Sequence, residues 1–208
     1  MKKFGVLIVS AIMVLAFSGP AHAFFIDFED GVDGGSVNDI AGVSFLDFNG
    51  YDARYGDCST GNYNCTSDDL GYGTGGYHHN GNFFLWAGPN ADAQGVIVDF
   101  TSNDGTWFST GYSSYSNFNV HAYFTDGTNA TVGGASNYGG PMSYLTINAG
   151  AGQFIDYVVL HDSGNYWMVD DMSGDATGVN PVPEPATILL LGSGLIGLGF
   201  FARKRKTA

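Results

Sequence analysis

The feature that most constrains the fold is a series of short apolar runs, each followed by a turn rich in Gly or Asn. The runs have the length of β-strands, and one of them, 118–125, alternates apolar and polar residues as a half-buried strand does. Asp126-Gly127 then favours a hairpin turn. No stretch of residues 24–178 shows a helical period. Ten strands are predicted: 24–28, 42–48, 83–87, 95–101, 106–112, 118–125, 129–132, 142–148, 153–161 and 166–172.

Together these strands predict an all-β domain over residues 24–178, an antiparallel β-sandwich or jelly roll. About 155 residues suffice for one domain with its own core. The high Gly content does not indicate disorder, because aromatic residues make up 15% of the chain and disordered chains are poor in them.

Charge is distributed very unevenly along the chain. Residues 24–185 hold all twenty acidic residues and one base, Arg54, which gives this part a formal charge of −19. Such a field repels phosphate backbones and favours cations. Nucleic acid is therefore excluded as a partner, whereas Ca²⁺ would be concentrated near the domain.

The N-terminus has the three parts of a secretory signal peptide. Lys2 and Lys3 form a charged start, 4–17 is apolar, and Ala21-His22-Ala23 gives a small-x-small cleavage site. A run of fourteen apolar residues falls short of the ~20 that a membrane-spanning helix needs. We predict a signal helix at 1–23 that is removed after export.

The C-terminus indicates a membrane segment with the same orientation. A linker, 179–185, ends in Pro-Glu-Pro, and 186–202 follow without a charge. As a helix they would rise about 26 Å, close to the ~30 Å core of a bilayer. The basic tail 203–208 should stay in the cytoplasm, which leaves the domain outside.

Val182, Pro183, Glu184 and Pro185, the apolar segment and the basic tail together resemble the PEP-CTERM sorting signal. The resemblance implies recognition of the Pro-Glu-Pro residues by an exosortase, an intramembrane protease-transpeptidase. It also implies export across the inner membrane of a Gram-negative bacterium that makes exopolysaccharide and biofilm. The protein would be held transiently in the membrane and then released to the cell surface or matrix. A permanent single-span anchor is the alternative.

The two ends of the domain, 26–31 and 167–172, resemble the first and last strands of galactose-binding-like jelly rolls, a fold common among carbohydrate-binding modules. The resemblance implies that these strands lie side by side and that acids from both hold a structural Ca²⁺. The matching residues are Glu29 and Asp170, with Asp171 as a neighbouring candidate. The alternative is that these acids are solvated turn residues.

A long stretch, 49–82, is expected to be irregular because it is rich in Gly, Asn, Asp and Tyr. It contains the only two cysteines, Cys58 and Cys65, and an exported protein favours a disulfide between them. Aromatic rings in such a loop can pack on sugar faces while Asp and Asn bind hydroxyls. The candidate glycan platform consists of Tyr51, Tyr55, Tyr63, Tyr72, Tyr77 and Trp86.

No spacing in the chain matches a catalytic motif such as Gly-x-Ser-x-Gly, His-Glu-x-x-His or a phosphate loop. His78 and His79 are adjacent, so on a strand they would point to opposite faces, which disfavours one metal shared by both and favours exposed loop residues. The leading interpretation is therefore a non-enzymatic surface or matrix protein that binds polysaccharide. The alternatives are a carbohydrate-active hydrolase and a purely structural matrix component.

Overall fold

The computed structural model describes residues 23–40, 42–48, 52–89, 95–100, 105–164 and 166–175. The predicted signal helix, the linker with Val182 to Pro185, the transmembrane helix 186–202 and the basic tail all lie outside these ranges, as does Tyr51. Within the described ranges, no helix has the length and apolar character needed to cross a bilayer.

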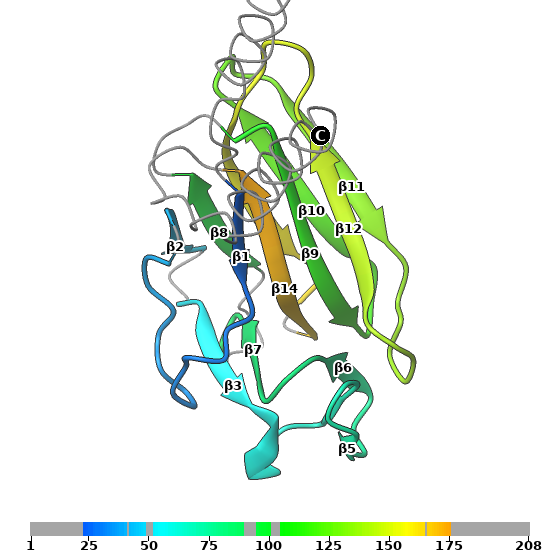
Figure 1. The fold of residues 1–208 in the computed structure, drawn as a ribbon. Helices are drawn as coiled ribbons and strands as arrows, with labels where there is room; N and C mark the ends of the chain where they lie inside the picture. Colours follow the sequence, from blue (N-terminus) through cyan, green and yellow to red (C-terminus); the bar gives the residue numbers. More distant parts are fainter. Residues whose placement is uncertain are drawn as a thin grey trace, which may run out of the picture. The chain divides into compact units, whose positions relative to one another are not determined.

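Two large sheets build the domain, and the first contains both ends of the described chain (Figure 1). Its order is β12-β9-β14-β7-β3, and β1 also pairs with β14. The strands are β1 (Ala23–Ile26), β3 (Arg54–Asp57), β7 (Phe83–Trp86), β9 (Trp107–Ser114), β12 (Ser143–Asn148) and β14 (Trp167–Asp175).

The second large sheet has the order β11-β10-β13-β8-β2. Its strands are β2 (Val43–Asp47), β8 (Gly95–Phe100), β10 (Phe118–Phe124), β11 (Asn129–Gly134) and β13 (Ile155–His161). All the described pairings in both large sheets are antiparallel. The predicted all-β antiparallel sandwich is confirmed.

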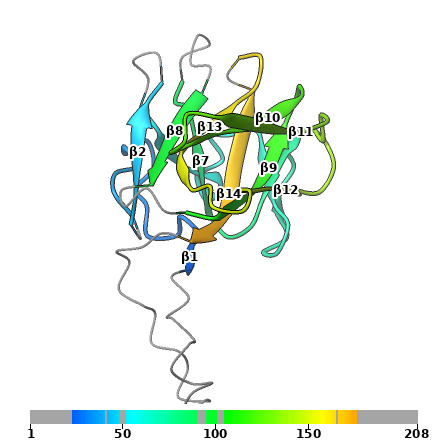
Figure 2. The same ribbon diagram turned by 90° about the horizontal axis from the view of Figure 1, so that it is seen from above.

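Buried side chains from the two large sheets form one core. Figure 2 shows the strands of both sheets from above. Strand β10 alternates strictly, with Phe118, Val120, Ala122 and Phe124 buried and the residues between them half-buried. The ring of Phe118 stacks on Tyr112 of the opposite sheet at a centroid distance of 5.1 Å. Alternation at period 2 therefore decides which face of β10 supplies the core.

All ten predicted strands are present, and Asp126-Gly127 closes the β10–β11 hairpin, where Gly127 has φ 82°. The expectation that 49–82 is irregular is wrong. That stretch contains β3, the 3-10 turn η1 (Cys58–Thr60), β4 (Cys65–Ser67), β5 (Tyr72–Gly73) and β6 (Tyr77–His79). Most of these elements are too short to show a period, and pairing with distant partners holds β3 on β7.

Strands β4, β5 and β6 form a third, small sheet in which β4 and β6 run parallel. Beside it lies a second apolar cluster of Cys58, Cys65, Phe84 and Met168. The described part of the domain thus has a main core between the large sheets and a smaller one under β4 and β6.

One irregularity of the first sheet creates space for a site. Strand β9 occupies one edge of β14, so β1 and β7 must share the other edge. Strand β1 pairs with the end of β14 from Met172 onward, whereas β7 pairs with Val169. Asp170 and Asp171 lie between these two partners, where β14 also shifts its register against β9. This gap leaves polar groups of β14 free to face other ligands.

Phe118→Ala tests the packing of the main core. The side chain is fully buried, so its removal should lower the free energy of unfolding by about 3–5 kcal/mol, measured by urea denaturation. The matched control is Phe154→Ala, since Phe154 is 40% exposed and should cost about 1 kcal/mol or less. Equal losses from the two variants would contradict the proposed sandwich core.

Candidate cation pocket and tyrosine cluster

Carboxylates surround a pocket at the gap between β1 and β7. The pocket has a volume of about 330 Å³. We call it the acidic pocket, and its lining residues are Phe25, Asp27, Glu29, Asp69, Asn80, Gly81, Asp170 and Asp171.

Glu29 is fixed by the chain that leads into β7. Its Oε1 accepts hydrogen bonds from the backbone N–H of Asn82 at 2.7 Å and of Phe83 at 2.9 Å. Gly81 allows this close approach, because a Cβ at that position would lie 2.1 Å from Glu29 Oε1. Its φ of +59° also favours glycine. The turn before β7 is therefore shaped around the Glu29 carboxylate.

Asp170 and Asp171 come from the gap in β14. The carboxylate of Asp170 is only 1% exposed and accepts the backbone N–H of Asp171 at 2.7 Å and of Asn80 at 2.9 Å. Asp171 Oδ2 accepts bonds from Asn80 Nδ2 at 2.5 Å and from the Tyr144 hydroxyl at 2.7 Å. Both acids are thus held in place by donors, and a carboxylate has about four acceptor sites, so lone pairs remain on each.

The third group of oxygens comes from loops. Asp69 Oδ1 accepts the Gly81 N–H at 2.7 Å and the Ser67 hydroxyl at 3.0 Å. Asp27 Oδ1 accepts the Glu29 N–H at 3.3 Å. Four separate chain segments therefore contribute to the pocket: the end of β1, the β4–β5 turn, the β6–β7 turn and β14.

Backbone strain is concentrated at the same place. Phe28 and Asp171 have φ of 58° and 47°, in the left-handed region that residues with a Cβ seldom adopt. One flanks Glu29 and the other follows Asp170. Strain of this kind persists where surrounding contacts fix it, and it gathers at functional sites.

The electrostatics of the pocket are unbalanced. Burial, with further contributions from Asp171 and Glu29, raises the pKa of Asp170 to about 9. Arg54 is the only Lys or Arg among the described residues, and it pairs with Asp52 at 3.0 Å. No lysine or arginine of the described chain therefore balances the acids of the pocket, whereas a bound cation would do so and would displace the proton of Asp170.

The donor set is suited to a hard cation. All ligands offered by side chains are carboxylate and amide oxygens, which Ca²⁺ prefers, whereas Zn²⁺ takes nitrogen and sulfur. The residues of the pocket therefore fit the Ca²⁺ implied by the jelly-roll resemblance.

The structure brings together Glu29, Asp170 and Asp171, the three residues predicted from the sequence, and pairs β1 with β14 as the jelly-roll resemblance implies. The sequence analysis missed Asp27, Asp69 and Asn80. Asp27 stands two residues before Glu29 and alternation could have placed it on the same side. Asp69 and Asn80 belong to the stretch expected to be irregular, and nothing local connects them to β14.

A second feature is a group of tyrosine rings drawn from four segments. We call Tyr77, Tyr115, Tyr138 and Tyr166 the tyrosine cluster. Tyr138 contacts Tyr77 at a centroid distance of 5.0 Å and Tyr115 at 5.2 Å, and Tyr115 contacts Tyr166 at 6.5 Å. Tyr115, Tyr138 and Tyr166 are 63%, 40% and 54% exposed, so large ring surfaces face the solvent.

Backbone contacts hold the cluster in position. The Tyr115 N–H donates to Tyr166 O at 2.9 Å, and the Tyr138 ring lies against Gly76, where a Cβ would approach to 2.1 Å. Asn64 Nδ2 donates to the Tyr138 hydroxyl at 2.6 Å. Burial, and then the neighbouring Tyr138, raises the pKa of Tyr77 to about 12. The Tyr77 ring is thus a neutral phenol, and these contacts fix the base of the cluster.

The predicted glycan platform has a different placement. Tyr55 packs on Phe28 and Phe83, and Tyr63 packs on Phe84 and Trp86. Tyr63, Tyr72, Tyr77 and Trp86 surround the second apolar cluster as half-buried residues. Of the predicted residues that the structure describes, Tyr77 alone contacts an exposed ring of the tyrosine cluster. The exposed members lie beyond the stretch that the sequence analysis considered.

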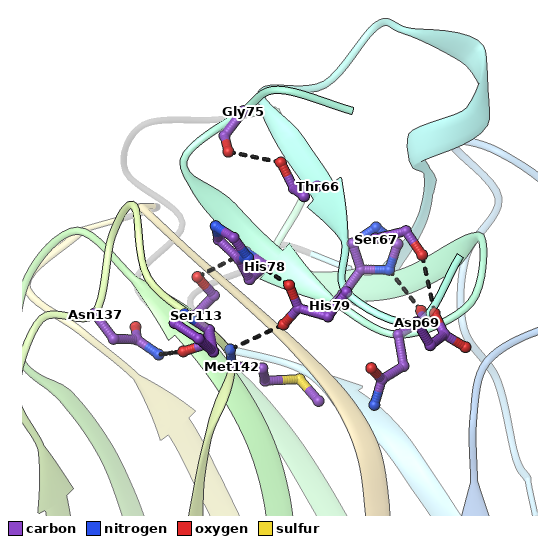
Figure 3. Close-up of polar contacts among 12 residues, drawn as sticks. Thr66, Ser67, Asp69, Gly75, His78, His79, Ser113, Asn137 and Met142 are labelled. Carbon is purple, nitrogen blue, oxygen red and sulfur yellow. Dashed lines mark hydrogen bonds and ion pairs between the residues drawn. The ribbon is translucent and has the colours of Figure 1, made fainter. Parts of the chain in front are cut away.

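The disulfide predicted between Cys58 and Cys65 is present, with a Cα–Cα distance of 6.0 Å. The two histidines of β6 lie apart, as alternation predicts (Figure 3). His78 Nδ1 contacts Asp68 Oδ1 at 2.6 Å, whereas His79 is fully buried. Burial lowers the pKa of His79.

Comparison with known proteins identifies the C-terminal signal. Residues 181–206 match the PEP-CTERM protein-sorting motif. The sequence-based assignment of that segment is confirmed, and the motif marks an exported protein that an exosortase processes and that is sorted to the cell surface. No curated protein matches this sequence.

Several solved structures are similar to the chain at low levels. One is a lysine-to-alanine mutant of CBM29-2, a family 29 carbohydrate-binding module, complexed with cellulohexaose. Its sequence identity is 10% and its TM-score is 0.38, and the match covers 74% of this chain and 91% of that chain. Another mutant family 29 module has 11% identity and a TM-score of 0.40, covering 79% and 99%. The K3 cleaved adhesin domain of Lys-gingipain from Porphyromonas gingivalis w83 has 13% identity and a TM-score of 0.39, covering 74% and 98%. At this similarity no ligand or residue role transfers to this chain.

Proposed function

We propose that this exported protein is a non-catalytic surface or matrix protein whose β-sandwich binds an uncharged polysaccharide through the tyrosine cluster. The observation that carries the proposal is the exposure of Tyr115, Tyr138 and Tyr166 as touching rings on a fixed base. Its setting would be the exopolysaccharide of a Gram-negative bacterium, with membrane attachment through the C-terminal helix before processing.

Ring orientation suits a single glycan chain. Sugar C–H faces pack on aromatic faces, and phenol hydroxyls bond sugar hydroxyls. The planes of Tyr115 and Tyr138 are inclined by 73° and those of Tyr115 and Tyr166 by 59°. Rings turned against one another follow a twisted chain better than the flat face of a crystalline polymer.

Charge narrows the class of polysaccharide. The domain carries a strong negative charge, and Asp162 accepts a hydrogen bond from Ser116, the residue after Tyr115. Uronate or sulfate groups would be repelled at low ionic strength. A neutral polysaccharide meets no such repulsion.

A hydrolase is the second candidate, because the raised pKa of Asp170 resembles that of a general acid. Two features favour binding instead. Asp170 is almost completely buried, and both of its oxygens already accept backbone N–H groups. Turnover of labelled neutral oligosaccharides by the chain, lost in Asp170→Asn, would favour the hydrolase.

The acidic pocket supports a further part of the proposal, a structural Ca²⁺. Glu29, Asp170 and Asp171 would hold it, joined by Asp27 and Asp69. The cation would supply positive charge in the acidic pocket, which has no basic residue in its lining. It would also link the segment after the first strand to the last strand. Without it, the like charges of Glu29, just after β1, and of Asp171 in β14 line the same pocket.

Tyr115→Ala and Tyr166→Ala should each weaken retention on neutral polysaccharides, such as hydroxyethylcellulose or a galactomannan, in affinity electrophoresis. Each loses one ring face, for which we expect about a tenfold loss of affinity, or ~1.4 kcal/mol. Tyr157→Ala is the matched control, since Tyr157 lies on β13, outside the cluster. Retention of the parent chain on neither polymer, or equal loss in the control, would refute the binding site.

Calcium should stabilise the domain. At a concentration one hundred times the dissociation constant it adds ~2.7 kcal/mol, which raises Tm by about 5–10 °C over the value in EDTA. Glu29→Gln should remove most of this increase, because it withdraws one charge from the pocket. Asp39→Asn, an exposed acid elsewhere, should leave it intact. A melting curve that is the same in EDTA and in calcium argues against the site.

In EDTA, stability should fall as the pH rises from 7 to 8.5. The pKa of Asp170 is about 9 in the folded chain, above its ordinary value of 3.8, so the folded state binds the proton more tightly. The proton on Asp170 therefore adds to the free energy of unfolding, and this stabilisation is complete below pH 3.8. It is lost as the pH rises toward 9, by up to about 1.4 kcal/mol per pH unit. Urea denaturation of Asp170→Asn should lack this slope, whereas Asp39→Asn should keep it. A parent chain without the slope would contradict the assignment.

A further inference from the structure

The disulfide lies against a buried histidine. Cys58, Cys65 and His79 are 5%, 2% and 0% exposed. The two sulfur atoms and a ring nitrogen of His79 all lie within 4.8 Å of one another. Three soft or borderline donors therefore converge beside the second apolar cluster.

The imidazole of His79 is oriented as a metal ligand would be. Its Nδ1 lies 2.6 Å from the carbonyl oxygen of Asn80, which can only accept, so Nδ1 carries the proton. Nε2 then has a free lone pair, and it has no hydrogen-bond partner among the described residues. Histidines that bind metals typically donate their second N–H to a backbone carbonyl in this way.

An unsatisfied buried nitrogen is uncommon in folded proteins and calls for an explanation. In the oxidised chain each sulfur is bonded to the other, so the disulfide lies beside the ring of His79 and offers no thiolate to a cation. Reduction would convert both sulfurs into ligands while the fold keeps all three residues close together. The pairing of β4 with β6 holds Cys65 close to His79 without the disulfide. The two strands run parallel, with Cys65 opposite Tyr77 and Ser67 opposite His79.

We propose that Cys58, Cys65 and His79 form a redox-gated site for a thiophilic divalent cation, Zn²⁺, which is available only when the disulfide is reduced. A dithiol reductant supplies two electrons and two protons, and it leaves as its own disulfide. The two thiols then lose their protons to solvent when the cation binds.

The dimensions agree with such a site. Zinc–sulfur bonds of about 2.3 Å and zinc–nitrogen bonds of 2.0–2.1 Å place tetrahedral ligand atoms about 3.5–3.8 Å apart. The present separations of up to 4.8 Å need only small side-chain movements. Three protein ligands leave the fourth position to a water or another small ligand. The spacing of the two cysteines is longer than in most zinc sites, and the η1 turn brings them together instead.

Cobalt(II), which replaces zinc in tetrahedral sites, is the probe. The purified full chain is reduced with a non-chelating phosphine without oxygen and titrated with Co²⁺. We expect one equivalent to give a thiolate-to-cobalt charge-transfer band and intense tetrahedral ligand-field bands. The oxidised chain should give neither band. Binding to carboxylates alone would give only weak octahedral absorption, so Asp170→Asn should keep the signal and the calcium site is tested separately.

His79→Gln should lower the affinity for Co²⁺ at least about tenfold and weaken the ligand-field bands. His161→Gln, in β13 of the second sheet, is the matched control and should bind like the parent chain. A second measurement does not depend on the spectrum: Zn²⁺ should slow alkylation of the two reduced thiols in the parent and in His161→Gln, but much less in His79→Gln. Near-ultraviolet circular dichroism of oxidised His79→Gln checks that it folds.

Two results would overturn the proposal. One is a reduced parent chain that binds no Co²⁺ with a charge-transfer band. The other is His79→Gln that folds and binds Co²⁺ and protects its thiols as the parent does, which would mean that the thiols bind alone.

Discussion

The antiparallel pairing of the first strand with the last is the interaction on which the rest of the structure depends. Because β9 already occupies the other edge of β14, β1 and β7 divide the remaining edge between them. The gap where one ends and the other begins places Asp170 in the interior without a strand partner on that side. Closure of the sheet and assembly of the acidic pocket are thus one event.

Much of this arrangement could be predicted from the sequence. Alternation along 118–125, and apolar runs separated by turn residues elsewhere, predicted ten strands correctly. The strands within 49–82 were missed because they are two to four residues long and depend on distant partners. The resemblance of the two ends of the domain to galactose-binding-like jelly rolls also predicted that Glu29 and Asp170 lie together. The sequence could not predict the positions of Asp69 or Asn80, because only the tertiary fold brings them to the pocket.

The tyrosines illustrate the same limit. Local composition drew attention to a stretch dense in Tyr, yet half-burial is the usual state of a ring near a small apolar cluster, and Tyr63 and Tyr72 adopt it. The exposed rings come from loops that are far apart in sequence, at Tyr115, Tyr138 and Tyr166. Only the order of the strands brings these loops to one place.

The position of β14 has a mechanical consequence. Tyr166 immediately precedes this strand, the strand ends at Asp175, and the sorting motif follows in the sequence at 181–206. A pull between a polymer held at Tyr166 and an attachment beyond Asp175 would therefore act along β14. The covalent backbone of β14 would carry this tension between its two ends, and its pairing with β9 would hold the strand in the sheet meanwhile. The strand that completes the fold would also be the one that carries tension.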